Sequence, residues 1–292
     1  MSILLTGGSG FIGRNLIELM DHKYQIVAPT SKELNLLDED AVEKFLVNNE
    51  IDFIIHSAAT PGHRNAPVFP DLVARNLRMF FNLARNKHRF KKMIYLGSGA
   101  IYDGRHYEPR MREDYFDAHV PADPHGFSKY VLSKYIEHEP SIIELRIFGV
   151  FGKYEDYAIR FISNAICKTF FGLPITIKQN RRFDYIFVND LVPIIEHFIE
   201  NSSARNIFNA CSDHAIDLLT LAGKVREISG SQSEIIVSKP GSELEYSGDN
   251  SLLRAAIPAL ELTPIDTAIR ELYNWYANNR HTINKELLLS DK

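Results

Sequence analysis

The sequence predicts an α/β protein whose first half forms a doubly wound parallel sheet and whose second half forms a smaller α/β lobe. Two observations support this prediction. Short apolar runs alternate with helical patterns up to residue 150, and a glycine-rich turn joins the first run to the first helix. Apolar strands that alternate with amphipathic helices are typical of a parallel sheet covered on both faces. Right-handed crossovers then give the Rossmann arrangement.

Each element of the first half has its own signal. Apolar runs predict five strands, at residues 2–7, 24–29, 52–58, 92–98 and 142–149. Apolar side chains near the 3.6-residue helical spacing predict four helices between them, at residues 11–20, 38–49, 69–86 and 128–139. We therefore assign residues 1–150 to one domain.

The second half, residues 151–292, has a looser pattern. Helices are predicted at residues 157–172, 217–230 and 265–280, and strands at residues 173–178 and 234–239. Two of these helices end at Gly172 and Gly230, because glycine accepts the left-handed conformation that commonly follows a last helical turn. We expect parts of this lobe to return to the parallel sheet.

Composition and charge argue against several classes of protein. The 292 residues carry a net charge of -4 with a pI near 6.3, so no basic excess is present to neutralise nucleic-acid phosphates. No apolar run approaches the roughly 18 to 20 residues of a membrane span, and no signal-peptide pattern is seen. The two cysteines, Cys167 and Cys211, suit buried free thiols, and the histidines lack metal-ligand spacing. We expect a cytoplasmic protein with no metal and with no nucleic-acid or membrane partner.

A glycine-rich turn, "LLTGGSGFIG", lies between the first strand and the first helix and contains Gly7, Gly8, Gly10 and Gly13. Glycines at these spacings permit a tight turn and a close backbone approach to a pyrophosphate, which the positive end of the helix attracts. In this strand–turn–helix context the pattern predicts a dinucleotide-binding domain. The second lobe is then expected to bind the substrate.

The end of the second strand distinguishes NAD from NADP. An acidic residue at this point binds the ribose 2′-hydroxyl of NAD, whereas a basic residue accommodates the 2′-phosphate of NADP. Thr30, Ser31 and Lys32 occupy the position, and Arg14 in the first helix adds a second cation. The sequence therefore favours NADP, with NAD as the second choice.

An ordered set of motifs resembles the extended short-chain dehydrogenase/reductases, the NAD-dependent epimerase/dehydratase family that modifies nucleotide sugars. The motifs are "TGGSGFIG" (6–13), "HSAA" (56–59), Asn76, "YLGSGAIYDG" (95–104), "HGFSK" (125–129) and "LRIFGVFG" (145–152). Residues 30–46 resemble the GDP-fucose synthase and dTDP-4-dehydrorhamnose reductase branches in particular. The resemblance implies cofactor contacts by Gly7, Gly10, Phe11, Ile12, Gly13, Arg14, Ser31, Lys32, Asp38, Ser57, Ala58, Ala59, Asn76 and Lys129.

The resemblance also implies a catalytic set made of a Ser or Thr, a Tyr and a Lys. Ser98 lies four residues before Tyr102, as in the family pattern "SxxVY". The helix motif "Y-G-x-S-K" occurs here as "H-G-F-S-K", which puts His125 at the tyrosine position and Lys129 at the lysine position. We therefore predict that Ser98, His125 and Lys129 are catalytic.

A second pair on the same helix competes with this assignment. Tyr130 and Lys134 have the same four-residue spacing, but Tyr130 is rotated by about 140° from His125. Only five residues separate Lys134 from Pro140, which leaves little room for the helix to end. We expect this pair to face packing contacts or a subunit interface.

A histidine at the tyrosine position leaves the proton donor open. In the family scheme the lysine lowers the pKa of the tyrosine, which then protonates the carbonyl oxygen as hydride arrives. An imidazolium at His125 would be repelled by the charge of Lys129. Three interpretations stay open: a working His125, proton transfer assisted by substrate or water, and an impaired enzyme that still binds cofactor. An introduced substitution at position 125 is a further alternative.

Substrate contacts are expected at the carboxyl ends of the strands. His63 and Arg64 follow the third strand, and Tyr102 follows the fourth. Arg182, in "RRFDY", suits a sugar-nucleotide diphosphate because a guanidinium binds phosphate oxygens in bidentate fashion.

Together these observations predict an NADP-dependent oxidoreductase of nucleotide-diphosphate deoxysugars, specifically a 4-keto-sugar reductase. Two alternatives remain: an epimerase that keeps NAD tightly bound, and a catalytically impaired protein that binds nucleotides or sugars. The resemblance also implies a homodimer in which residues 71–87 and 125–138 of two copies form a four-helix bundle.

Overall fold

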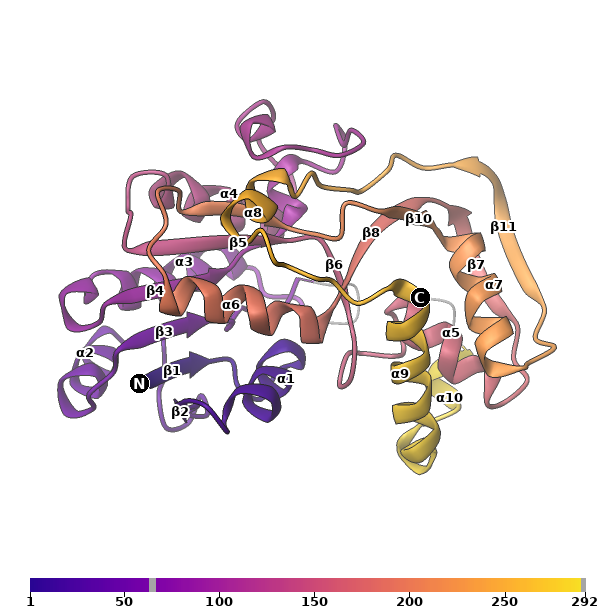
Figure 1. The fold of residues 1–292 in the computed structure, drawn as a ribbon, viewed down its shortest axis with the longest axis horizontal. Helices are drawn as coiled ribbons and strands as arrows, with labels where there is room; N and C mark the ends of the chain where they lie inside the picture. Colours follow the sequence, from indigo (N-terminus) through magenta and orange to yellow (C-terminus); the bar gives the residue numbers. More distant parts are fainter. Residues whose placement is uncertain (63–66, 290–292) are drawn as a thin grey trace.

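A six-stranded parallel sheet forms the core of the larger domain in the computed structural model, which describes residues 1–62 and 67–289 (Figure 1). The strands lie in the order β2-β1-β3-β4-β5-β9, and each neighbouring pair is parallel. Their bounds are β1 Ser2–Thr6, β2 Gln25–Val27, β3 Phe53–His56, β4 Lys92–Leu96, β5 Ile142–Ile147 and β9 Ile207–Ala210. The predicted doubly wound parallel sheet is confirmed.

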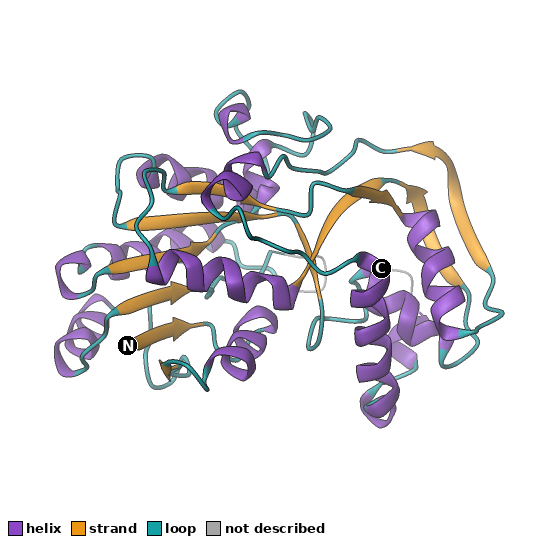
Figure 2. Cartoon of the chain, in the orientation of Figure 1, coloured by secondary structure: helices purple, strands orange, loops and turns teal. Residues whose placement is uncertain are grey.

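Helices cover both faces of this sheet (Figure 2). They are α1 Phe11–Met20, α2 Glu39–Asn48, α3 Leu72–Ala84, α4 Pro124–Ile136 and α6 Leu191–Glu200. Helices α2, α3 and α4 pack side by side on one face, and α1 packs with α6 on the other. In β1, Ile3 and Leu5 join one buried cluster and Leu4 joins the opposite one. Both faces of the sheet are therefore apolar, which is why the strand is a continuous apolar run in the sequence.

Helix α4 begins at Pro124, earlier than the residue 128 expected from the sequence. The Asp123 side chain caps it by accepting the Gly126 N–H at 2.8 Å. Proline suits the first helical turn, where its missing N–H removes no hydrogen bond. The earlier start places His125 in the first turn of α4, at the end of the helix that faces the carboxyl edge of the sheet.

The smaller lobe contains two short sheets and four α-helices in the described part of the chain. The first sheet has the order β10-β8-β6, and the second pairs β7 with β11 in parallel. The strands are β6 Gly149–Phe151, β7 Ile175–Asn180, β8 Arg182–Phe187, β10 Ala215–Asp217 and β11 Ile235–Ser242. The helices are α5 Phe161–Thr169, α7 Leu218–Ser229, α9 Ile265–Asn278 and α10 Glu286–Leu289, whereas α8 Ser251–Ala256 packs on the parallel sheet.

The chain passes repeatedly between the two parts. Only Phe148 separates β5 of the parallel sheet from β6 of the lobe. After β8 the chain returns as α6 and β9, leaves again for β10, and comes back to pack α8 against β9 before α9 (Figure 1). None of the described helices is long and apolar enough to cross a membrane.

Candidate active site

A cleft of about 1640 Å³ lies at the carboxyl ends of the parallel strands, where the smaller lobe faces the sheet. Its walls include the residues that follow β1, β3, β4 and β5, together with side chains from α5, β7 and β8 of the lobe. Ligands of open α/β sheets bind in this position, because the loops that leave the strands converge there.

The glycine turn after β1 forms one end of the cleft. Gly7 has a φ of +75°, and its carbonyl oxygen accepts the Gly10 N–H at 3.0 Å. A Cβ at Gly13 would overlap the Gly7 carbonyl oxygen, so only glycine lets α1 pack this closely against the turn. Helix α1 begins without a side-chain cap, and Phe11 and Ile12 of its first turn line the cleft. Its uncapped N–H groups fit the pyrophosphate of a dinucleotide.

The residues predicted to select NADP differ in their contacts. Ser31 lines the cleft, whereas Lys32 is exposed and is not among the residues that line the cleft. Arg14 stacks on Tyr154, a lining residue, with its guanidinium carbon 3.7 Å from the ring centroid. Asp38 is exposed and caps α2 by accepting a backbone N–H at 3.1 Å. The structure therefore uses the Asp38 carboxylate to start a helix and does not bring it to the cleft.

Asn76 ties the loop after β3 to helix α4. Its side-chain oxygen accepts the Thr60 N–H at 2.7 Å, and its nitrogen donates to the Ser128 hydroxyl at 3.3 Å. Three residues predicted to bind the cofactor line the cleft along this loop: Ser57, Ala58 and Ala59. Asn76 itself is buried outside the lining, so the structure places it to hold the loop. The predicted substrate residues His63 and Arg64 lie outside the described residues.

Ser98, His125 and Lys129 all line the cleft. Lys129 is buried, and its Nζ donates to the Leu96 carbonyl oxygen at 3.1 Å. Burial lowers the pKa of Lys129 to about 8, although the nearby Glu144 carboxylate acts in the opposite direction. This lysine therefore changes charge within the working range of many enzymes.

The competing pair on α4 faces away from the cleft. The Tyr130 hydroxyl donates to Asp117, and Lys134 Nζ donates to the same carboxylate at 3.2 Å. His125 instead lies against Gly62 on the cleft wall, where an added Cβ would be 3.1 Å from the His125 Cβ. Of the two registers, the structure brings the one with His125 and Lys129 to the cleft.

Ser98 lies just beyond β4, where its Oγ caps the short helix η2 (Gly99–Tyr102). Tyr102, a predicted substrate contact, ends this helix and is buried. Its hydroxyl donates to Asn209 Oδ1 at 2.7 Å and accepts from Arg146 Nη1 at 3.1 Å. Tyr102 therefore belongs to an interior network and does not reach the cleft.

Two neighbouring arginines occupy different sides of the lobe. Arg182 is exposed outside the cleft, with its Nε 2.9 Å from the Glu245 carboxylate. Arg181 lines the cleft, and its guanidinium carbon lies 4.9 Å from the Phe183 ring centroid. Adjacent residues of an extended chain point to opposite sides. The arginine at the cleft is therefore the one before the residue that the sequence analysis singled out.

Sequence analysis missed two further cleft residues from the smaller lobe. Glu155 is buried, accepts a hydrogen bond from Ser163, and has its pKa raised to about 8 by burial. Tyr246 places its hydroxyl against Gly99, where an added Cβ would be 2.6 Å from the phenolic oxygen. Tyr246 reaches the cleft through a contact between residues far apart in the chain, and no local motif marks either residue.

Two further features of the described residues concern the cysteines and the side chains that could bind a metal ion. Cys167 and Cys211 are free and buried. Within residues 1–62 and 67–289, no group of three or more His, Cys, Asp or Glu side chains is arranged to hold a metal ion.

The sequence of this chain is similar to a known protein family and to several known enzymes. Residues 3–211 match the family described as "NAD dependent epimerase/dehydratase family". The GDP-L-colitose synthase of Yersinia pseudotuberculosis is 25% identical over 225 residues, covering 69% of this chain and 73% of the relative. The ADP-L-glycero-D-manno-heptose-6-epimerase of Brachyspira hyodysenteriae is 24% identical over 298 residues, covering 87% of this chain and 91% of the relative.

Solved structures share the fold over almost the whole chain. A GDP-mannoheptose C4 reductase from Campylobacter jejuni with NADP bound superposes with a TM-score of 0.81 at 19% identity, covering 94% of this chain and 98% of its own. A Thermus thermophilus UDP-glucose 4-epimerase in complex with NAD gives 0.79 at 20% identity, covering 97% and 100%. Because the family match spans more than half of its residues, the chain belongs to the NAD-dependent epimerase/dehydratase family of extended short-chain dehydrogenase/reductase enzymes.

Proposed function

We propose that the protein is an NADP-dependent reductase of a nucleotide-diphosphate 4-keto-deoxysugar. The observation that carries this proposal is one cleft lined by the glycine turn, Ser98, Lys129 and Arg181. The cleft therefore brings together three features. They are the glycine turn suited to a dinucleotide, the polar pair Ser98 and Lys129 suited to a carbonyl group, and the Arg181 cation suited to a diphosphate. The GDP-L-colitose synthase and the GDP-mannoheptose C4 reductase among the similar proteins support this class of reaction.

The residues of the cleft have separable tasks in this reaction. The bound dinucleotide would supply the hydride. The uncapped start of α1 holds the pyrophosphate, because its N–H groups and dipole favour negative charge. Ser98 donates a hydrogen bond to the carbonyl oxygen, where negative charge develops in the transition state. Lys129, whose ammonium keeps two further N–H donors beyond the Leu96 bond, orients the nicotinamide ribose.

The preference for NADP rests on cations near the end of β2. Ser31 and Lys32 follow β2, Arg14 stacks on the cleft residue Tyr154, and no acidic residue precedes Glu33 after the strand. We expect Arg14→Ala and Lys32→Ala to weaken NADPH binding and to leave NADH binding nearly unchanged. Fluorescence titration of both dinucleotides checks this difference.

The reaction is tested with purified protein, NADPH and a panel of GDP-, dTDP- and UDP-linked 4-keto-6-deoxyhexoses. We expect NADPH absorbance to fall with one member, and mass spectrometry to show a product heavier by two hydrogens. Lys129→Met serves as the inactive control. If no member of the panel oxidises NADPH above the rate of this control, the reductase proposal is wrong.

An epimerase with tightly bound NAD is the second candidate, favoured by the epimerases among the similar proteins. In that case NAD copurifies with the protein, and heating releases it into the supernatant. The sugar stereocentre then inverts without net consumption of the dinucleotide, which chromatography of the sugar products detects.

A further inference from the structure

A tyrosine from the smaller lobe reaches the cleft beside the catalytic serine. The hydroxyl of Tyr246 lies against Gly99, so that an added Cβ there would be only 2.6 Å away. The Ser98 side chain lies close enough to the same hydroxyl to lower the pKa of Tyr246. Tyr246 lines the cleft together with Ser98, His125 and Lys129. A phenol is therefore present at Ser98 even though α4 contributes a histidine.

Packing fixes the ring of Tyr246. Its centroid lies 4.9 Å from those of Phe148 and Tyr107, and 6.0 Å from that of Phe183. Its backbone N–H donates to the Arg182 carbonyl oxygen at 2.9 Å, so the residue runs alongside β8. Contacts on several sides leave the hydroxyl end directed at Gly99, the residue next to Ser98 of the cleft lining.

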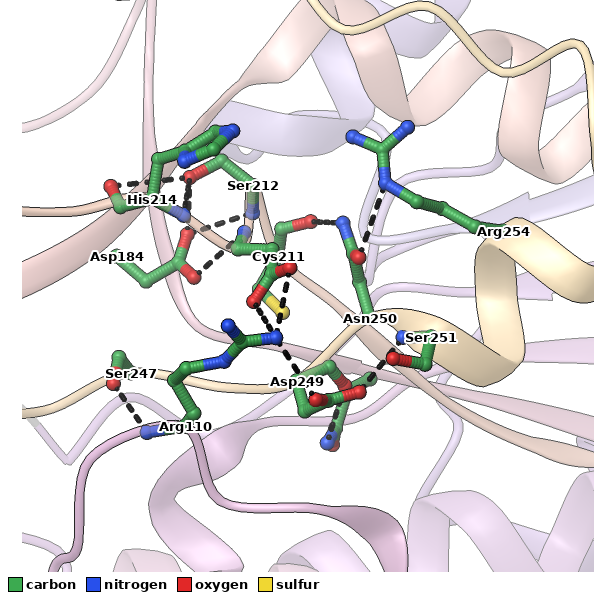
Figure 3. A network of polar contacts seen from close by, with 12 residues as sticks. Arg110, Asp184, Cys211, Ser212, His214, Ser247, Asp249, Asn250, Ser251 and Arg254 are labelled. Atoms are coloured by element: carbon green, nitrogen blue, oxygen red, sulfur yellow. Dashed lines mark hydrogen bonds and ion pairs between the residues drawn. The ribbon is translucent and has the colours of Figure 1, made fainter.

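The chain that follows Tyr246 is held by the polar network of Figure 3. The Ser247 hydroxyl accepts the Arg110 N–H at 2.7 Å. The Arg110 guanidinium lies 2.8 Å from Asp213 and 3.1 Å from Asp249. On the other side of the network, the Asp184 carboxylate accepts backbone N–H groups that follow β9. The phenol is thus presented by a segment that is anchored to both the sheet and the lobe.

We propose that Tyr246, with Ser98, supplies the proton to the substrate oxygen, the task of the tyrosine that His125 replaces in α4. The inference rests on the proposed reductase function. As hydride adds to the carbonyl carbon, the C=O double bond becomes a single bond and its electron pair moves to oxygen. The phenolic O–H bond breaks and its proton goes to that oxygen. Water in the cleft then returns a proton to the phenolate.

The surroundings of Tyr246 suit an acid that stays protonated. Burial and the neighbouring Tyr107 and Tyr102 raise the pKa of Tyr246 well above its ordinary value, while Ser98 and Arg181 act to lower it. A phenol in this state does not ionise at neutral pH. It still protonates an alkoxide, which is a stronger base, and the Arg181 cation stabilises the phenolate that forms.

The first test compares matched phenol deletions in the holoenzyme. We expect Tyr246→Phe to lower kcat by about 100-fold or more while the dissociation constant of NADPH stays unchanged. Tyr107→Phe removes the adjacent hydroxyl, which lies outside the described lining of the cleft, and should retain wild-type kcat. The proposal is overturned if Tyr246→Phe keeps kcat within about threefold of wild type.

The pH profile separates Tyr246 from His125. If Tyr246 is the acid, kcat/KM for reduction shows no step at about pH 6.5, and His125→Phe keeps the wild-type profile, in which any step at about pH 8 belongs to Lys129 or Glu155. If His125 is the acid, the rate falls as pH rises through about 6.5, and this step disappears in His125→Phe. The second result overturns the proposal.

A crystal structure of the wild-type protein with NADP decides the geometry without any sugar. We expect the Tyr246 hydroxyl and the Ser98 hydroxyl to face the nicotinamide from the same side. A Tyr246 hydroxyl turned away from Ser98 contradicts the assignment, whether or not a substrate has been found. Absence of turnover with the sugar panel contradicts the reductase function alone, so the two failures are distinguishable.

Discussion

The Lys129 ammonium group donates a hydrogen bond to the Leu96 carbonyl oxygen, with 3.1 Å between nitrogen and oxygen, at the point where β4 ends and the cleft begins. The lysine is buried there, and the lowered pKa shows that the folded protein disfavours its charge. Burying the Lys129 charge in the cleft destabilises the folded protein. This indicates that the lysine has a functional role and not a stabilising one.

Lys129→Met should make the protein more stable and inactive. The pKa of Lys129 falls from 10.5 in the unfolded chain to about 8 in the folded one, so the folded state carries the cost of the buried charge at pH 7. Relieving this cost should raise the free energy of unfolding by about 1 to 2 kcal/mol. Urea denaturation at pH 7 measures this change in the free energy of unfolding. Lys134→Met is the control, and we expect it to gain no stability.

The lowered pKa of Lys129 also makes the free energy of unfolding depend on pH. Between about pH 8 and 10.5 the unfolded chain binds the Lys129 proton more strongly than the folded protein does. The contribution of this group therefore makes wild-type stability rise through that window. Lys129→Met should lack the rise, and an identical slope in both proteins would contradict the assignment.

His56 should contribute to acid unfolding. Burial, aided by the Lys129 charge, lowers the pKa of His56 to about 3, and its Nδ1 lies 2.8 Å from the Thr6 hydroxyl. Since the unfolded chain binds this proton below about pH 6.5, stability falls between about pH 6.5 and 3, by up to about 1.4 kcal/mol per pH unit. His56→Gln should flatten this slope in a denaturation series, whereas the exposed His22→Gln should not.

Arg146 and Glu144 form a buried ion pair within β5, with Nε 3.1 Å from the carboxylate. The Ser133 hydroxyl donates to Glu144 and accepts from Arg146. Arg146→Met leaves a buried charge unpaired and should cost about 3 to 5 kcal/mol of unfolding free energy. The double variant Glu144→Gln/Arg146→Met should recover part of this loss. Equal stability of the single and double variants would show that the pair is not coupled.

Arg181 should contribute to substrate affinity and Arg182 should not. Only Arg181 lines the cleft, while Arg182 is exposed and bound to Glu245. We expect Arg181→Ala to raise KM for the nucleotide sugar by about 10-fold or more, and Arg182→Ala to change it little. The reverse ranking in steady-state kinetics would place the diphosphate outside the cleft.

Gly13→Ala should abolish dinucleotide binding in a folded protein, because its Cβ would overlap the Gly7 carbonyl oxygen. Gly223→Ala in α7 is the matched control, since an added Cβ there meets nothing within 4 Å. It should stabilise the helix by up to about 1 kcal/mol and leave NADPH affinity unchanged. Circular dichroism and NADPH fluorescence separate the two effects.

Much of the larger domain could be predicted because its signals are local. The expected first helix, residues 11–20, coincides with α1, and the five expected strands all occur. The start of α4 differs because its first turn is set by the Asp123 cap and Pro124, which add nothing to the apolar spacing. Strands β6, β8 and β10 of the lobe and β9 of the parallel sheet are absent from the prediction, since short strands carry little periodicity of their own.

Side-chain placement was harder to predict than the fold. The choice between Arg181 and Arg182 depends on a register of one residue. Tyr246 depends on a tertiary contact with Gly99, a residue far away in the chain. The sequence analysis predicts no element after residue 280, yet Leu288 of α10 is buried, because its packing surface comes from the lobe.

The repeated crossings of the chain between sheet and lobe limit how the enzyme opens. A body attached through one linker swings as a hinge, whereas here Phe148 joins two strands almost without interruption and further crossings brace the junction. We therefore expect the cleft to be preformed in the free enzyme. Small-angle scattering should give the same radius of gyration for the free and the dinucleotide-bound enzyme.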